Sequence, residues 1–233
     1  VETLFGKWQQ AVMPLFTGIQ LGDKPKALIV QVSETLLTTF RAAPLLDPYD
    51  IYQHLMDYWA EAMQDDAYLI AADGWVALPR RILETDKKGK TRDKGWTCDL
   101  LPKPYIVARY FAAEQAELEA KHAELEGVAS QIAELEEEHG GEDGALSGFD
   151  KVSAAQVKDR LAEIGDDPDS TDERVVLKQW QQLSAREAAL KRTVKTLEAE
   201  LDRQAHDHYF NLSETEVKAL VVQDKWLACL QAD

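Results

Sequence analysis

Apolar residues recur at helical spacing along most of the chain, and the longest such pattern lies between residues 101 and 210. From about Pro104 to Glu138 an apolar residue returns every seven positions, and a second stripe follows the same rhythm from about Asp172 to His208. Heptads of this kind predict coiled-coil helices. Each stripe is narrow and surrounded by charged residues, so we expect the two helices to pair antiparallel as a hairpin arm. The predicted seam consists of Phe111, Leu118, Leu125, Ile132, Leu183, Leu190, Val194 and Leu197, with Val128, Leu135, Val176, Trp180 and Leu201 beside them.

Three shorter helical patterns precede the arm and are rich in aromatic residues. The first runs from Glu2 to Phe16, and the second begins at Pro25 and is stopped by Pro44. The third has the clearest start, because Asp47 can cap the free amides while Pro48 occupies the first helical position. We expect these helices to form a compact base.

Between Asp66 and Asp99 the apolar residues no longer follow the helical spacing. The apolar runs 68–72 and 75–78, separated by an Asp-Gly turn, predict a short β-hairpin, and Arg80–Ile82 and Gly95–Cys98 are expected to add strand. A buried helix is the alternative, because short apolar runs do not distinguish the two.

Two capping boxes mark further helix starts. Ser153 with Gln156 predicts a short helix, closed by Gly165, that packs across the tip of the arm. Ser213 with Glu216 predicts a last helix. The expected fold is therefore mainly α, with a helical base and small β patch (1–100), a long antiparallel coiled-coil hairpin arm (101–210) and the start of a C-terminal helix (211–233).

The charge balance narrows the choice of partners. The 233 residues carry a formal net charge of −16, which argues against a nucleic-acid binder that uses its whole surface. One basic cluster stands out, and it predicts a mobile loop able to contact DNA phosphates while Trp75 or Trp96 stacks nearby. The alternative is a solvated turn. The candidate cations are Arg80, Arg81, Lys87, Lys88, Lys90, Arg92 and Lys94.

Catalytic and metal-binding patterns are missing from the sequence. Paired acids such as Asp65-Asp66 are expected to be solvated helix faces, and His206 and His208 are two apart and should point to different sides of a helix. The HExxH, GxSxG and GxxxxGK[ST] motifs do not occur. The two cysteines, Cys98 and Cys229, form no CxxC pair, which fits a reducing cytoplasm. No apolar run reaches the roughly 18 residues of a membrane span. We therefore assign no catalytic, cofactor-binding or metal-binding residue.

Several stretches resemble the modification (M) subunit of type I restriction-modification systems, in the part that follows its methyltransferase domain. They are LLDPYDIYQHLMDYW at 45–59, MQDDAY at 63–68 with GW at 74–75, GWTCDLLPK at 95–103, and LSETEVKAL at 212–220 with KW at 225–226. The resemblance spans nearly the whole chain, and the coiled-coil insertion is its least diagnostic portion.

This resemblance implies an N6-adenine DNA methyltransferase that uses S-adenosylmethionine. Such an enzyme assembles from two M subunits and one specificity (S) subunit, binds DNA, and works with a restriction (R) subunit. The chain lacks the FxGxG methyl-donor loop and the [ND]PP[FY] tetrapeptide that receives the flipped adenine, so no catalytic residue carries over and no cofactor is expected in this part. Because the chain begins at Val1 and ends in a helical pattern, we expect a C-terminal fragment that serves subunit assembly and DNA clamping.

A self-contained coiled-coil adaptor or dimerisation protein is the alternative, since the stripes alone would suffice for it. It predicts a stable oligomer formed through the arm. A DNA-binding regulator would need a recognition helix, to which Trp180-Gln181-Gln182 is the nearest approach.

Overall fold

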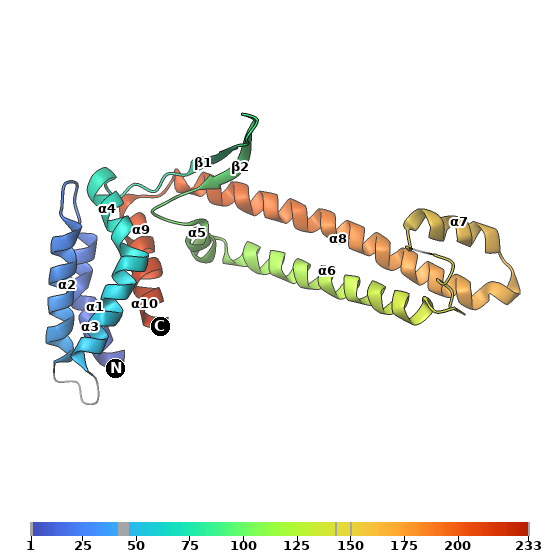
Figure 1. Ribbon diagram of the computed structural model, residues 1–233, viewed down its shortest axis with the longest axis horizontal. Helices are drawn as coiled ribbons and strands as arrows, with labels where there is room; N and C mark the ends of the chain where they lie inside the picture. The colour runs from blue at the N-terminus through green and yellow to red at the C-terminus, as the bar shows by residue number, and fades with distance from the viewer. Residues whose placement is uncertain (1, 42–46, 143, 150, 233) are drawn as a thin grey trace. The chain divides into compact units, whose positions relative to one another are not determined.

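The computed structural model describes residues 2–41, 47–142, 144–149 and 151–232, and it divides into two compact units (Figure 1). The base unit comprises residues 1–110 and 204–233, and the coiled-coil unit comprises residues 111–203. The chain is mainly helical with one small antiparallel sheet, so the predicted fold class is confirmed. Within the described ranges, no helix combines the length and the apolar character needed to cross a bilayer.

The base unit is built from helices at both ends of the chain. Its N-terminal helices are α1 (Glu2–Thr17), α2 (Pro25–Phe40), α3 (Pro48–Tyr58), the π-helix η1 (Trp59–Met63) and α4 (Gln64–Asp73). The predicted cap is confirmed, because the Asp47 side chain accepts a hydrogen bond from the Tyr49 amide at 2.8 Å. Pro44, the predicted stop of the second helix, and the first two residues of the 45–59 motif lie outside the described residues.

The C-terminal helices α9 (Glu214–Ala219), η3 (Leu220–Leu227) and α10 (Ala228–Ala232) lie in the core of this unit. The fully buried ring of Trp226 packs edge-on against Phe16 of α1 at 5.4 Å. Ser213 and Glu216 form the predicted capping box at the start of α9. The last helix therefore completes the base rather than standing apart from it.

The prediction of a hairpin over 68–78 is wrong. Residues 64–73 continue the preceding helix, with Ala67 and Ile70 buried three positions apart, and Gly74 ends it with φ +80°. The sheet instead consists of β1 (Arg80–Thr85) and β2 (Thr91–Thr97), which agrees with the strand expected from Arg80 and from Gly95.

The coiled-coil unit contains α6 (Ala112–His139), α7 (Ala154–Ile164), the 3₁₀ turn η2 (Pro168–Ser170) and most of α8 (Thr171–Tyr209). Cross-helix contacts confirm the antiparallel pairing. Trp180 Nε1 donates to Glu136, Arg186 donates to Glu124, and His122 lies 3.2 Å from Glu198, so the partner number on α8 rises as the number on α6 falls. Figure 1 shows α6 and α8 side by side, with α7 against α8.

The seam follows the prediction with one exception. Leu118, Val128 and Leu135 are buried on α6, while Leu125 and Ile132 are half-buried. On α8, Leu190, Val194 and Leu201 are buried, and Leu183 and Leu197 are half-buried. Phe111 is not a seam position within the helix, because it is the N-cap of α6 with φ −130° and ψ +30° and separates α6 from α5 (Lys103–Tyr110).

The short helix α7 packs on the coiled coil as predicted. Its side chains join those of α8 in a cluster at the end of the unit. The buried members of this tip cluster are Leu135, Leu146, Val157, Ile164, Val176, Leu177 and Trp180.

Candidate nucleic-acid interface

All seven candidate cations lie on the β-hairpin or its turn. The strands pair with Arg80 opposite Thr97, Arg81 opposite Trp96 and Glu84 opposite Arg92. The register shifts between Arg81 and Leu83, where Gly95 in β2 adopts φ +99° and supplies an extra residue, as in a β-bulge. Every residue of β1 is exposed, whereas the last three residues of β2, from Gly95 to Thr97, are half-buried.

The turn at the end of the hairpin is a hydrogen-bonded structure, not the loose loop expected from the sequence. The Asp86 carboxylate accepts hydrogen bonds from the amides of Lys88 and Lys90 at 2.8 and 2.9 Å, and the Gly89 amide donates to the Asp86 carbonyl. Gly89 has φ +79°, a conformation that a side chain would strain. The basic cluster was also predicted as a single loop, whereas Arg92 and Lys94 lie in β2.

Three candidate cations near the base of the hairpin already have anionic partners. Arg80 forms two hydrogen bonds with Asp99, at 2.7 and 2.9 Å, and they hold the pKa of Asp99 below its ordinary value. Arg81 lies 3.4 Å from Asp93. Lys94 lies 3.1 Å from Glu84 across the strands. These pairs leave little net positive charge at this end of the hairpin.

The other four candidates, Lys87, Lys88, Lys90 and Arg92, form the hairpin tip. All are exposed, and no ion pair joins any of them to a carboxylate of a described residue. The nearby Asp86 carboxylate accepts hydrogen bonds from two backbone amides through its Oδ1 atom. The seven candidates therefore fall into two groups. Three lie at the open end of the hairpin and are ion-paired, and four lie at its tip without an ion pair to a described residue. Sequence spacing does not reveal this difference.

The two tryptophans proposed for stacking have different environments. Trp75 is buried, and its Nε1 donates to the Ile19 carbonyl at 2.9 Å, so it cannot meet a base. Trp96 is half-buried on the hairpin and contacts the rings of His206 and Tyr209 edge-on at 5.3 and 5.4 Å. Phe210, which no sequence pattern indicated, extends this group through a 5.3 Å contact with His206.

His206 and His208 do point to different sides of α8, as the spacing predicts. His206 faces Trp96 and Phe210, whereas the ring of His208 lies 4.1 Å from that of Tyr110. Among the described residues, no group of three or more His, Cys, Asp or Glu side chains is placed to hold a metal ion.

The expectation that Asp65-Asp66 is a solvated pair is wrong for Asp66, which is 5% exposed. Its carboxylate accepts a hydrogen bond from Trp226 Nε1 at 2.8 Å and lies 2.6 Å from Lys225 Nζ. Lys225 in turn donates to the Leu100 carbonyl at 2.9 Å. Burial raises the pKa of Asp66 above its ordinary value, and the hydrogen bonds from Lys225 and Trp226 offset part of that rise. This network is internal to the base unit and is structural.

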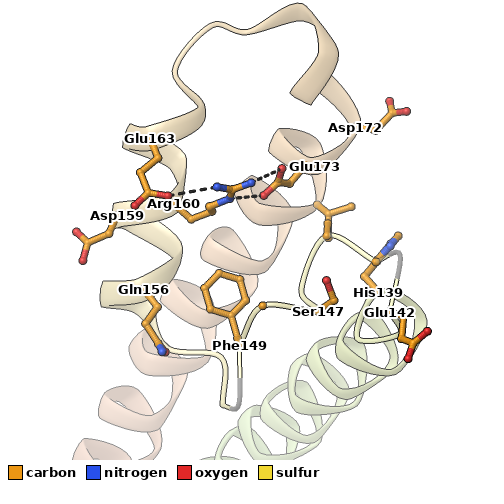
Figure 2. Close-up of a pocket in the computed structure, with 14 residues that line it drawn as sticks. His139, Glu142, Ser147, Phe149, Gln156, Asp159, Arg160, Glu163, Asp172 and Glu173 are labelled. Carbon is orange, nitrogen blue, oxygen red and sulfur yellow. Dashed lines mark hydrogen bonds and ion pairs between the residues drawn. The ribbon is translucent and has the colours of Figure 1, made fainter.

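A cavity of about 790 Å³ lies at the tip of the coiled-coil unit, beside α7 (Figure 2). Figure 2 shows Phe149 in the middle of the cavity, and Arg160 between Glu163 and Glu173, to which it is joined by ion pairs of 3.2 and 2.6 Å. Asp159 and Asp172 point away from this ion-paired group. No nucleophile and general base are paired around the cavity among the described residues, so we assign it no chemistry.

Comparison of the chain with protein-family models, with curated proteins and with solved structures finds no match. The assignment of the hairpin as a nucleic-acid interface therefore rests on the geometry of the hairpin and on the sequence resemblance described above.

Proposed function

We propose that this chain is the non-catalytic C-terminal part of a type I modification subunit, a cytoplasmic N6-adenine DNA methyltransferase component. In this proposal the base unit serves assembly with the S subunit and a second M subunit, and the hairpin tip contacts DNA in the complex. The methyl donor, S-adenosylmethionine, binds in the parent enzyme outside these residues. The R subunit joins when the system restricts.

The observation that carries the proposal is the convergence of the matching stretches in one cluster of contacts around the buried Asp66 and Trp226. Tyr58, from the first stretch, donates a hydrogen bond to the Lys225 carbonyl at 3.3 Å. Asp66, from the second, binds both Lys225 and Trp226, and the Leu100 carbonyl, from the third, accepts from Lys225. The matching stretches are far apart in sequence but contact one another in the fold. These contacts support the view that the stretches belong to one folding unit of the type I modification subunit.

The hairpin suits a contact with the DNA backbone. Four unpaired cations at the end of a hydrogen-bonded turn offer positive charge to phosphates without a fixed pattern of donors for base edges. Affinity from such contacts arises from counterion release and is independent of sequence. The target sequence would then be read by the S subunit.

Replacing the four tip cations by glutamine, in K87Q/K88Q/K90Q/R92Q, should weaken binding of the chain to a random 24-base-pair duplex. Each phosphate contact contributes about 0.9 to the slope of log K against log salt. We expect the slope to fall by about 3 to 4 as the four contacts are lost. Fluorescence anisotropy from about 50 to 200 mM salt measures both quantities.

The matched control is R80Q/R81Q/K94Q, which removes the cations already paired with Asp99, Asp93 and Glu84. It should change the salt slope by less than about 1, because ion-paired cations release few counterions. Equal effects of the two variants would reject the tip as the contact. Unchanged binding in the tip variant would reject DNA contact by the hairpin.

The parentage is tested separately, by the intact mass and peptide sequence of the native polypeptide in its source cell. A chain that extends upstream through an [ND]PP[FY] tetrapeptide supports the methyltransferase proposal. A chain that starts near Val1 would replace it with the adaptor alternative. That alternative predicts an oligomer, whereas a seam filled by α6 and α8 of the same chain favours a monomer in light scattering.

A further inference from the structure

One face of the hairpin holds the apolar side chains of Leu83 and Trp96 beside the Arg81–Asp93 ion pair, and its aromatic surface continues onto the end of α8. Trp96 lies opposite Arg81, and Leu83 is two residues beyond Arg81 in the same strand, so Leu83 and Trp96 share a face. From Trp96, edge-on ring contacts lead through His206 to Phe210. We call Leu83, Trp96 and Phe210 the aromatic face, and all three belong to the base unit.

The two ends of this face are open to solvent. Leu83 is 62% exposed and Phe210 is 60% exposed. The ring of Phe210 contacts that of His206, and the high exposed fraction of Phe210 leaves much of its surface accessible. Exposed apolar side chains that gather beside a charged element are typical of interaction sites.

The charges around the aromatic face favour a polyanion over a protein partner. The four unpaired cations of the hairpin tip are on the same element. Lys103 places its ammonium 5.8 Å from the centre of the Trp96 ring. Aromatic rings beside a track of cations form the usual surface for single-stranded nucleic acids, in which bases stack on the rings and phosphates meet the cations.

We propose that the aromatic face binds a single-stranded stretch of nucleic acid, with an unpaired base stacked on Phe210 and the backbone running toward the hairpin tip. The inference rests on the nucleic-acid contact proposed above and names the form of nucleic acid that the site prefers. A duplex keeps the faces of its bases stacked inside, so only an unpaired or extruded base reaches the rings.

The dimensions of the hairpin suit a short strand. The β1 partners of Arg92 and Trp96 are Glu84 and Arg81, which are three residues apart and therefore about 10 Å apart at roughly 3.3 Å per residue. A strand with stacked bases spans that distance in about three nucleotides at ~3.4 Å each, and a stretched strand needs fewer. A 12-nucleotide probe therefore covers both the cations and the rings.

The test compares three fluorescent probes on the whole chain by anisotropy: a 12-nucleotide oligothymidine, an abasic strand of the same length, and a 12-base-pair duplex. F210A should weaken oligothymidine binding about fivefold or more, since about fivefold is the low end of the stacking contribution of one base. Abasic and duplex binding should stay within about twofold. F210L should behave like F210A while keeping the apolar contact with His206. Y49A, which removes another exposed aromatic side chain of the base unit, should change none of the three.

The outcomes separate this inference from the function on which it rests. If F210A leaves oligothymidine binding unchanged, or weakens the abasic strand equally, the stacking site is overturned. The same holds if the duplex binds and oligothymidine does not. K87Q/K88Q/K90Q/R92Q should weaken all three probes, and its effect on the duplex tests the hairpin contact independently of Phe210. If no probe binds the unsubstituted chain, both proposals fail and the aromatic face is left as a surface for a protein.

Discussion

Each of the two units contains a network of three side chains built around an ion pair, but the networks differ in depth. In the coiled-coil unit, Arg160 bridges Glu163 and Glu173, and its side chain is 43% exposed. In the base unit, the Lys225 side chain is 13% exposed where it meets Asp66 and Trp226. Water can replace the partners of Arg160 if the pair opens, whereas the groups around Asp66 have no such substitute.

The networks also join different parts of the chain. Arg160 and Glu173 are 13 positions apart and link α7 to the adjacent helix α8. Asp66 and Trp226 are 160 positions apart and link α4 to η3. The base unit therefore depends on a buried polar contact between distant segments, whereas the coiled-coil unit depends on its apolar stripe and tip cluster.

The largest effect is expected for D66A in the base unit. Removing one partner of a buried ion pair typically costs about 3 to 5 kcal/mol, because the remaining charge is left unpaired. Here Lys225 loses its carboxylate partner and keeps the Leu100 carbonyl, and Trp226 loses its acceptor. Chemical denaturation followed by tryptophan fluorescence measures the loss of unfolding free energy.

Two control variants sharpen this comparison. D65A removes the exposed neighbouring carboxylate and should change stability by less than about 0.5 kcal/mol. R160Q breaks the exposed network and should cost no more than about 1 kcal/mol. A D66A effect as small as that of R160Q would show that the buried network contributes no more than a surface pair.

A smaller and more local effect is expected for L177A in the coiled-coil unit. Leu177 is fully buried in the tip cluster, where a leucine-to-alanine change typically costs about 2 to 5 kcal/mol. Because the contacts of Leu177 lie within this cluster, we place the effect at the low end of that range. Hydrogen exchange should show weaker protection over α7 and the start of α8, with η3 unchanged.

V175A is the matched control, because Val175 is 60% exposed and lies two residues away on the same helix. It should leave exchange in α7 within about 0.5 kcal/mol of the unsubstituted chain. Exchange that accelerates equally in α7 and in η3 would contradict the view that the tip cluster stabilises only its own unit.

Local signals in the sequence predicted local structure well. The caps at Asp47, Ser153 and Ser213 were correct because a cap depends on residues two or three positions away. The coiled-coil stripes were correct because their period repeats over many turns. The hairpin expected over 68–78 was wrong because a short apolar run lacks a period long enough to separate strand from helix.

The environments of charged and aromatic residues could not be predicted in this way. The sequence around Asp66 does not distinguish it from a solvent-exposed carboxylate. Its burial depends on η3, which is far away in the chain. The pairing of Arg80 with Asp99 spans 19 positions across a turn, so the sequence could not separate paired from available cations. Phe210 follows the last helical stripe without extending it, and it is linked to the hairpin through His206, whose ring contacts that of Trp96.

The smallest effect concerns pH and the capping box of α9. Hydrogen bonds from the Ser213 hydroxyl and amide hold the pKa of Glu216 below its ordinary value of 4.5. The folded state therefore favours the ionised carboxylate, and this contribution is present above pH 4.5 and is lost as the pH falls through the lower folded-state pKa. E216Q removes the titration while keeping an acceptor at this position.

The stability difference between the unsubstituted chain and E216Q should therefore be greatest above about pH 5.5 and shrink toward pH 3. Comparing the two chains at each pH is essential, because the pKa of Asp66 is raised and its contribution has the opposite sign. Stability from Asp66 is present below its ordinary pKa of 3.8 and is lost as the pH rises through the folded-state value. Both chains contain Asp66, so its contribution cancels in the difference. A difference that grew on acidification would mean that the Ser213–Glu216 hydrogen bonds do not favour the ionised form, and the exposed cap would then resemble the buried network in its pH response.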